Sequence, residues 1–343
     1  MIQLGNIHSA VVQWVGNKTN GDGVVFSSGI STLAEVEGSI KKLIEDSFHF
    51  ERLFHFTSID SIDFNFIFRF TSSIFKDESD IVEQSHNIAR HLYEQSVHPN
   101  TKGGELYVIY YKNCLFNDTA CDAIAILKTE SKDIYLKSQN TGDGISVIEE
   151  RGTSLKKLDK GCIVFNTEKE NGYVVASVDN TNNGNDAHYW TDRFLHLEQR
   201  CDSFHQTEAF FQMFKTFIKG MTTDQSISNA DRALLARKCS EYLQSNDSFS
   251  LDIIGEKVLQ EDAIKSKFQE FSGYYQSEKK INLSGDILVS QDSVNHNRGG
   301  SISIVKLDNH FEVKFLGGER YVVRGYDENR CMYYYQLFFN EEK

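Results

Sequence analysis

Lys102, Gly103 and Gly104 are the first residues whose types could do chemistry, because glycines beside a lysine are a common way to hold a phosphate. They lie in HPNTKGGELYVIYY at 98–111, after Pro99, the single proline of the sequence. A phosphate loop runs from a strand into a helix, so that backbone N–H groups and the helix N-terminus face the anion. Here a helical pattern ends near Ser96 and the glycines precede a strand. We therefore predict a plain turn, in which Pro99 stops the helix and the glycines allow unusual backbone angles.

Histidines and acidic residues raise a second possibility, a metal site. His86 and His91 are five residues apart and His98 lies past the end of a predicted helix, whereas ligands on one helix usually stand three or four apart. Glu278-Lys279-Lys280 has the letters of a nuclease motif but ends a helical, charged segment, and His296-Asn297 lacks the partner ligands of an HNH element. We expect solvated surface at these positions, no metal and no cofactor.

Nucleophilic chemistry is not indicated either. No G-x-S-x-G elbow occurs, and the six cysteines, at 114, 121, 162, 201, 239 and 331, include no C-x-x-C pair. Several stand in apolar runs such as CIVF at 162–165, where a reduced thiol behaves as a small hydrophobe. We expect no catalytic set, and therefore a protein that is not an enzyme.

Basic residues close to aromatic ones are the remaining signal, because such a face can bind a nucleic-acid backbone while its rings stack on bases. Between residues 298 and 324, basic residues alternate with the aromatic residues Phe311, Phe315 and Tyr321, and the acidic residues Asp308 and Glu312 lie in the same segment. Charged edges of an ordinary sheet are the alternative interpretation. The predicted nucleic-acid-binding residues are Arg298, Lys306, Lys314, Arg320 and Arg324, with Lys102 and Lys219 as secondary candidates.

Composition limits the choice of partner. The 343 residues carry 36 Lys and Arg against 49 Asp and Glu, a net charge of −13. A surface this acidic disfavours DNA binding over the whole molecule, although a local basic patch remains compatible with it. The N-terminus lacks the pattern of a secretory signal, and no apolar run reaches 18 residues. We expect a cytoplasmic protein with no membrane partner.

The elements that must position these residues indicate an α+β fold. Strands are predicted at 7–15, 64–70, 105–111, 123–127, 134–137, 162–166 and 173–179, and helices at 33–44 and 80–96. From Trp190 to about Lys280 the apolar period becomes helical, and the last sixty residues return to strands separated by DN, GGE and DENR turns. We predict an N-terminal α+β domain at 1–185, a helical segment at 186–280 and an antiparallel β-rich part, a meander, at 281–343.

Three collinear stretches resemble a known family. HPNTKGGELYVIYYKN, the segment from YVVASVDN to the FIKG at 217–220, and NRGGSISIVKLDNHFEVKFLGGER fall in the order and spacing seen in the 37-kDa nucleoid-associated proteins of bacteria. The family pattern has a Gly-Gly pair leading into a strand, a central segment ending in F-x-K-G, and a late G-G-x-[IL]-x-[IV] strand. Here these are Gly103-Gly104, Phe217–Gly220 and Gly299–Ile304.

The resemblance implies a cytoplasmic protein of the nucleoid that binds double- or single-stranded DNA, with RNA as a further candidate partner, and that has no established catalytic centre. Two interpretations reconcile it with the charge of −13. Either a local basic face, which a homodimer would double, contacts DNA, or an acidic adaptor reaches the nucleoid through a DNA-handling protein. A metal-dependent nuclease with a scattered site is a third, weaker alternative.

Overall fold

The computed structural model describes residues 2–99, 101–181, 189–221, 229–297, 304–307, 310–314 and 322–341. Its contacts divide the chain into two compact units, Met1–Arg200 and Cys201–Lys343, each described here by itself. Helices and antiparallel sheets occur in both units, which confirms the predicted α+β class. None of the described helices is both long and apolar enough to span a bilayer.

An antiparallel sheet forms the centre of the first unit. Its strand order is β11-β4-β10-β9-β6-β5-β2-β3, and β1 also pairs with β5. The strands are β1 (Ile2–Gln3), β2 (Asn6–Val15), β3 (Val24–Val25), β4 (Leu53–Phe56), β5 (Gly104–Phe116), β6 (Thr119–Thr129), β9 (Lys160–Phe165), β10 (Val174–Asp179) and β11 (Leu197–Gln199). Strands β7 (Lys132–Asn140) and β8 (Ile145–Thr153) form a separate hairpin between β6 and β9.

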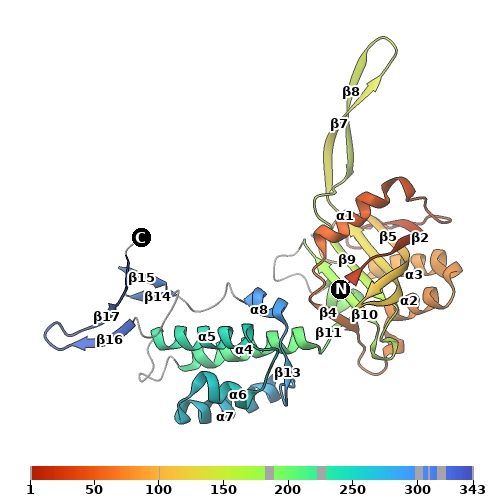
Figure 1. Ribbon diagram of the computed structural model, residues 1–343. Coiled ribbons are helices and arrows are strands. Elements are labelled where there is room, and N and C mark those ends of the chain that lie inside the picture. Colours follow the sequence, from red (N-terminus) through yellow and green to blue (C-terminus); the bar gives the residue numbers. More distant parts are fainter. Residues whose placement is uncertain are drawn as a thin grey trace. The chain divides into compact units, whose positions relative to one another are not determined.

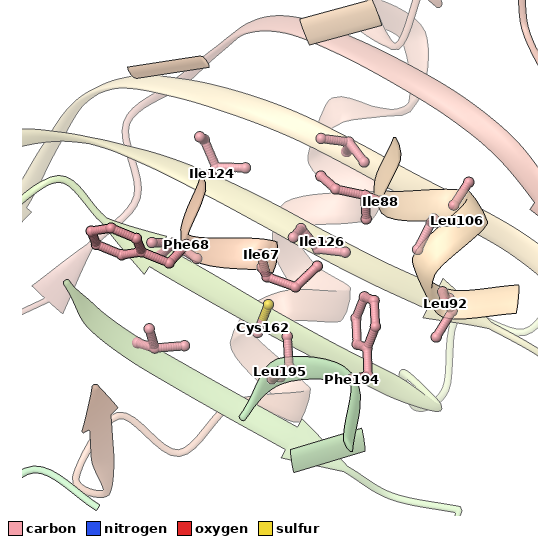
Figure 2. Packing of buried hydrophobic residues seen from close by; sticks show 14 of the residues in the cluster. Ile67, Phe68, Ile88, Leu92, Leu106, Ile124, Ile126, Cys162, Phe194 and Leu195 are labelled. Carbon is pink, nitrogen blue, oxygen red and sulfur yellow. The ribbon is translucent and has the colours of Figure 1, made fainter. Parts of the chain in front are cut away.

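Helices cover both faces of this sheet, so alternate residues of a central strand enter two different cores (Figure 1). In β5, Leu106 and Val108 pack in the core under helices α2 (Phe66–Lys76) and α3 (Ile81–Gln95). Ile109 packs in the opposite core, with α1 (Glu37–Ser47). Figure 2 shows the first of these cores, where Ile67, Ile88 and Leu92 from the helices meet strand residues. This burial of both faces explains why β5 and β6 read as nearly continuous apolar runs.

The segment at 64–70 was predicted to be a strand, and that prediction is wrong. It contains the start of α2, where the Asn65 side chain caps the helix by accepting from the Phe68 N–H at 2.9 Å. The buried residues of α2 are Ile67, Phe68, Thr71 and Ile74, a helical spacing. The phenylalanines of FNFIFRF stand at every second position, as expected for one face of a strand. Residues four apart also share one face of a helix, so this spacing fits both structures.

Helices dominate the second unit as far as residue 297. They are α4 (Ser203–Gly220), α5 (Asn229–Gln244), α6 (Leu251–Ile254), α7 (Asp262–Lys279) and α8 (Gln291–Asn297). Phe214 and Phe217 of α4 pack edge-on against Phe268 of α7, at ring-centroid distances of 5.8 and 5.1 Å. Two-residue strands β12 (Ser248–Phe249) and β13 (Ile287–Leu288) pair with each other, and Phe249 and Ile287 are buried in this core.

The strands after residue 297 form two hairpins where a single meander was expected. Strand β14 (Ile304–Leu307) pairs with β15 (Phe311–Lys314), and β16 (Val322–Asp327) pairs with β17 (Met332–Leu337). Both pairings are antiparallel, as predicted, but among the described residues they belong to separate two-stranded sheets. The division into three domains, at 1–185, 186–280 and 281–343, stays a prediction.

Candidate nucleic-acid interface

The loop at 101–104 binds a cation of the protein itself and does not have the geometry of a phosphate cradle. The Lys128 ammonium lies beneath it and donates to the carbonyl oxygens of Gly104 at 3.1 Å and Lys102 at 3.4 Å. It also donates to the Val15 carbonyl at 2.9 Å. A phosphate requires N–H donors, whereas this backbone presents acceptors. The segment is a turn into β5, as predicted.

The reason for the two glycines differs from the one expected. Neither Gly103 nor Gly104 has a positive φ. A Cβ at Gly104 would lie 1.8 Å from the Thr129 carbonyl oxygen, and one at Gly103 would lie 2.6 Å from the Trp14 ring. Glycine is needed here because neighbouring strands and a ring approach the backbone closely, and not because the backbone angles are unusual.

Charged residues at the same end of the sheet are buried and compensated. Lys160 and Glu130 form an ion pair at 3.2 Å with 2% and 4% of their side chains exposed. The Asp159 carboxylate accepts from the N–H groups of Glu130 and Ser131 and from the Ser131 hydroxyl. Burial lowers the pKa of Lys128 to about 8. These contacts hold the ends of β6 and β9 together, so we assign them a structural role.

The histidines considered as metal ligands contact other groups. The His86 ring nitrogen lies 2.8 Å from the Ser27 carbonyl oxygen, and the His91 ring nitrogen lies 3.2 Å from that of Phe194. Burial lowers the pKa of His91. Glu278 and Lys279 pair with each other at 3.4 Å at the end of α7. Over the residues that the structure covers, no group of three or more His, Cys, Asp or Glu is placed to hold a metal ion.

The seven predicted nucleic-acid-binding residues fall into three groups. Arg298 and Arg320 lie outside the described residues. Lys306, Lys314 and Arg324 occupy β14, β15 and β16, opposite Glu312, Ile304 and Tyr335, and their side chains are outside the description. Lys102 is exposed in the first unit, and Lys219 is exposed in the last turn of α4 in the second.

Lys219 has a basic neighbour on α4. Lys215 lies one turn earlier, and its ammonium donates to the Asn297 side-chain oxygen at 3.1 Å. The pKa of Lys215 is lowered, first by burial and then by the positive charge of Lys219. Asn297 ends α8 and immediately precedes Arg298. The structure therefore brings Lys215, one turn from Lys219, to the residue that immediately precedes the predicted basic segment.

Exposed tyrosines on β16 and β17 are the feature that the sequence analysis did not identify. Tyr326 and Tyr333 are cross-strand partners, 50% and 66% exposed, with ring centroids 4.9 Å apart in an edge-to-face arrangement. Tyr335 is two residues from Tyr333 and therefore on the same face of the hairpin. The alternating tyrosines of MYYYQL were the available signal, since residues two apart in a strand share a face.

The other face of this hairpin carries Tyr334. Its ring lies over Gly325, where a Cβ would be 2.3 Å from the ring. Rings therefore cover both faces of the hairpin. The acidic residues of the hairpin, Asp327 at the end of β16 and Glu328 in the turn, lie at one end of it, and Asp327 pairs with Arg330 at 3.8 Å. A strand pair with exposed rings, and with Arg324 in register with Tyr335, can stack on unpaired bases and approach a phosphate backbone.

Comparison with protein families decides the affiliation. The family described as nucleoid-associated protein YejK matches residues 31–320, most of the chain. The chain belongs to this family. The match confirms the resemblance seen in the sequence. It covers Lys102, Lys219, Lys306 and Lys314 but ends before β16 and β17, so the tyrosine face lies outside the matched residues. A search of curated proteins gave no match.

Proposed function

We propose that this chain is a non-enzymatic DNA-binding protein of the bacterial nucleoid, located in the cytoplasm, that helps to organise the chromosome through its C-terminal hairpins. The observation that carries the proposal is the exposed tyrosine face of β16 and β17, with Arg324 in register beside it. Family membership supports the nucleoid as its location. Stacking on rings favours single-stranded DNA or RNA, while Lys306, Lys314, Arg324 and Lys219 would contact phosphates of either form.

Charge explains why such a contact must be local. A chain with a net charge of −13 repels a polyanion over most of its surface, so affinity has to come from a few cations and from stacking. Arg298, which precedes β14 in the sequence, and Arg320, which lies between β15 and β16, would complete the basic set. A homodimer would place two such faces on one molecule and raise the affinity without any new contact.

Binding of fluorescent dT30 and of a 30-base-pair duplex from about 50 to 300 mM salt tests the proposal. Replacing Tyr326 and Tyr333 with alanine should raise the Kd for dT30 at least about tenfold, because each stacked base contributes roughly 1–3 kcal/mol. Tyr274→Ala, at a tyrosine 67% exposed on α7, is the matched control and should leave the Kd unchanged. Absence of binding by the wild type at the lowest salt would remove direct DNA contact.

Arg324→Gln combined with Lys306→Gln and Lys314→Gln separates phosphate contacts from stacking. Each lost phosphate contact should reduce the slope of log K against log salt by about 0.7–0.9. Incubation of the protein with plasmid DNA and Mg²⁺ or Mn²⁺ tests the proposal that it is not an enzyme, and cleavage of the plasmid would overturn that proposal.

The acidic surface favours one second candidate, an adaptor recruited to the nucleoid by a DNA-handling protein. It predicts no affinity for naked DNA at any salt concentration. Recovery of one specific DNA-handling partner with the full chain, together with absent dT30 binding, would favour the adaptor over direct contact.

A further inference from the structure

We propose that two copies of this chain associate through one face of the β7–β8 hairpin, with the tip of each hairpin over an apolar pocket of the other copy. This inference rests on the homodimer proposed above and names its surface. The hairpin projects from the sheet of the first unit (Figure 1). Nine cross-strand pairs run from Lys132 and Thr153 at its base to Asn140 and Ile145 at its tip.

One face of this hairpin, called its apolar face, carries four exposed aliphatic side chains. Cross-strand partners point to the same face, and residues two apart along a strand do so as well. By this rule Ile134, Leu136, Val147 and Ile145 share a face, and they are 58%, 73%, 57% and 78% exposed. On the opposite face the Glu150 carboxylate accepts from the Tyr135 hydroxyl at 2.8 Å and from Lys137 at 3.1 Å.

An exposed apolar face of this size is expected to bind another surface, which would remove it from water. The four aliphatic side chains together expose on the order of 400–500 Å², the size of patch that marks an interaction surface on a soluble protein. An isolated two-stranded hairpin is only marginally stable in water, so packing against a further surface would stabilise these nine pairs.

The register makes the face complementary to itself. Consider two hairpins packed face to face and antiparallel, related by a two-fold axis that passes midway between the Ile134–Arg151 pair and the Leu136–Glu149 pair. Ile134 then lies opposite Leu136 of the second copy, and Arg151 lies opposite Glu149 of the second copy. At these two pairs apolar residues meet each other and each charge meets its opposite.

The same two-fold arrangement provides an occupant for an apolar pocket at the base of the hairpin. The pocket has a volume of about 260 Å³ and is lined by Leu33, Val36, Leu43 and Leu127 together with Thr153 and Leu155 of the hairpin base. Ile145 at the tip of the hairpin stands eight residues before Thr153 at its base, roughly 27 Å away along the strand. The tip of an extended hairpin therefore cannot reach the pocket at the base of the same hairpin. In the antiparallel arrangement Val147 of the second copy lies over Thr153, and Ile145 of the second copy lies over Leu155.

Size is consistent with a reversible dimer. The two faces would bury on the order of 1,000 Å², which is the lower end of the range for specific protein interfaces. Arg151 and Glu149 cancel in charge on each face, so the contact can form although each copy carries a net charge of −13.

Sedimentation velocity of the full chain from about 1 to 100 µM tests the proposal, with dimer expected within this range. Leu136→Asp should raise the dimer dissociation constant at least about tenfold, because a buried unpaired charge replaces an apolar contact. Gln139→Asp, on the opposite face of the same strand, is the matched control and should have no effect. Far-ultraviolet circular dichroism checks that each variant is folded.

Charge reversal tests the register. Glu149→Arg and Arg151→Glu should each weaken the dimer, because like charges then face each other, and the double variant should restore it to within about threefold. A wild type that stays monomeric at 100 µM would overturn both the homodimer and this surface. A wild-type dimer that Leu136→Asp leaves intact, or a double variant that does not recover, would overturn this surface alone. The tyrosine-dependent affinity for dT30 is measured separately and stands or falls by itself.

Discussion

The buried Lys128 ammonium gives a testable dependence of stability on pH. Its residue is 1% exposed, and its three hydrogen-bond acceptors are backbone carbonyls, which are neutral. Burial therefore lowers the pKa from 10.5 to about 8. The unfolded chain keeps this proton up to about pH 10.5, whereas the native protein releases it near pH 8.

The sign follows from proton linkage. Between these two values the unfolded state binds one more proton than the native state, so the free energy of unfolding rises with pH. The gain is complete above about pH 10.5 and is lost as the pH falls through about 8. At 1.36 kcal/mol for each pKa unit it amounts to about 3 kcal/mol in total, of which about 2 kcal/mol is present at pH 9.5.

Urea unfolding followed by tryptophan fluorescence measures this effect, because Trp14 and Trp190 are both in the first unit. Lys128→Met removes the titrating group with little change in volume, and Lys157→Met changes an exposed lysine as the control. From pH 7 to 9.5 the wild type and Lys157→Met should gain about 2 kcal/mol relative to Lys128→Met. Parallel curves for all three proteins would refute the reasoning, because they would mean that Lys128 keeps its proton in the native state throughout this range.

Two further predictions concern the same unit. Gly104→Ala should lower the free energy of unfolding by about 3 kcal/mol, since its Cβ would lie 1.8 Å from a backbone oxygen of β6, whereas Gly38→Ala in α1 has open space and should be neutral or stabilising by up to about 1 kcal/mol. Equal stability of the two variants would contradict the close approach. Glu168 accepts two hydrogen bonds from Arg200 and pairs with His55, and the Arg200 contact is the main reason that the pKa of Glu168 is lowered. Arg200→Met should therefore lower the free energy of unfolding by about 1 kcal/mol at pH 7. This difference should shrink as the pH falls below about 4.5, because protonation of Glu168 removes the ion pair from the wild type as well. A difference that stays constant with pH would argue against the ion pair.

Local patterns identified most of the elements. The helix at 80–96 and the strand beginning near 105 were predicted within two residues of α3 and of the start of β5, because their apolar periods are long and unambiguous. The segment at 64–70 failed because its aromatic spacing fits both periods, and the cap from Asn65 together with packing against the sheet decided in favour of a helix. The C-terminal strands were recognised from turn chemistry, but their pairing into two hairpins depends on registers that composition does not specify.

The candidate sites divide in the same way. Basic residues at 298–324 could be selected from sequence, whereas the Tyr326–Tyr333 pair required knowing which residues face each other across a turn. The apolar face of the β7–β8 hairpin was also missed, because only the register shows that the apolar residues of the two strands lie on the same face. The glycines at 103 and 104 were assigned to backbone freedom, and the strands beside them show that the constraint is space.

The sequence by itself determined the α+β class, the family, the net charge of −13 and the positions of the most regular helices and strands. These properties depend on composition and on spacing along the chain, which folding does not change. The tertiary structure alone decided that a lysine is buried against three carbonyls, that tyrosines face one another on a terminal hairpin, and that an apolar face stands exposed beside an apolar pocket. Each of these depends on which residues of different elements are brought together, and only strand register and packing determine that.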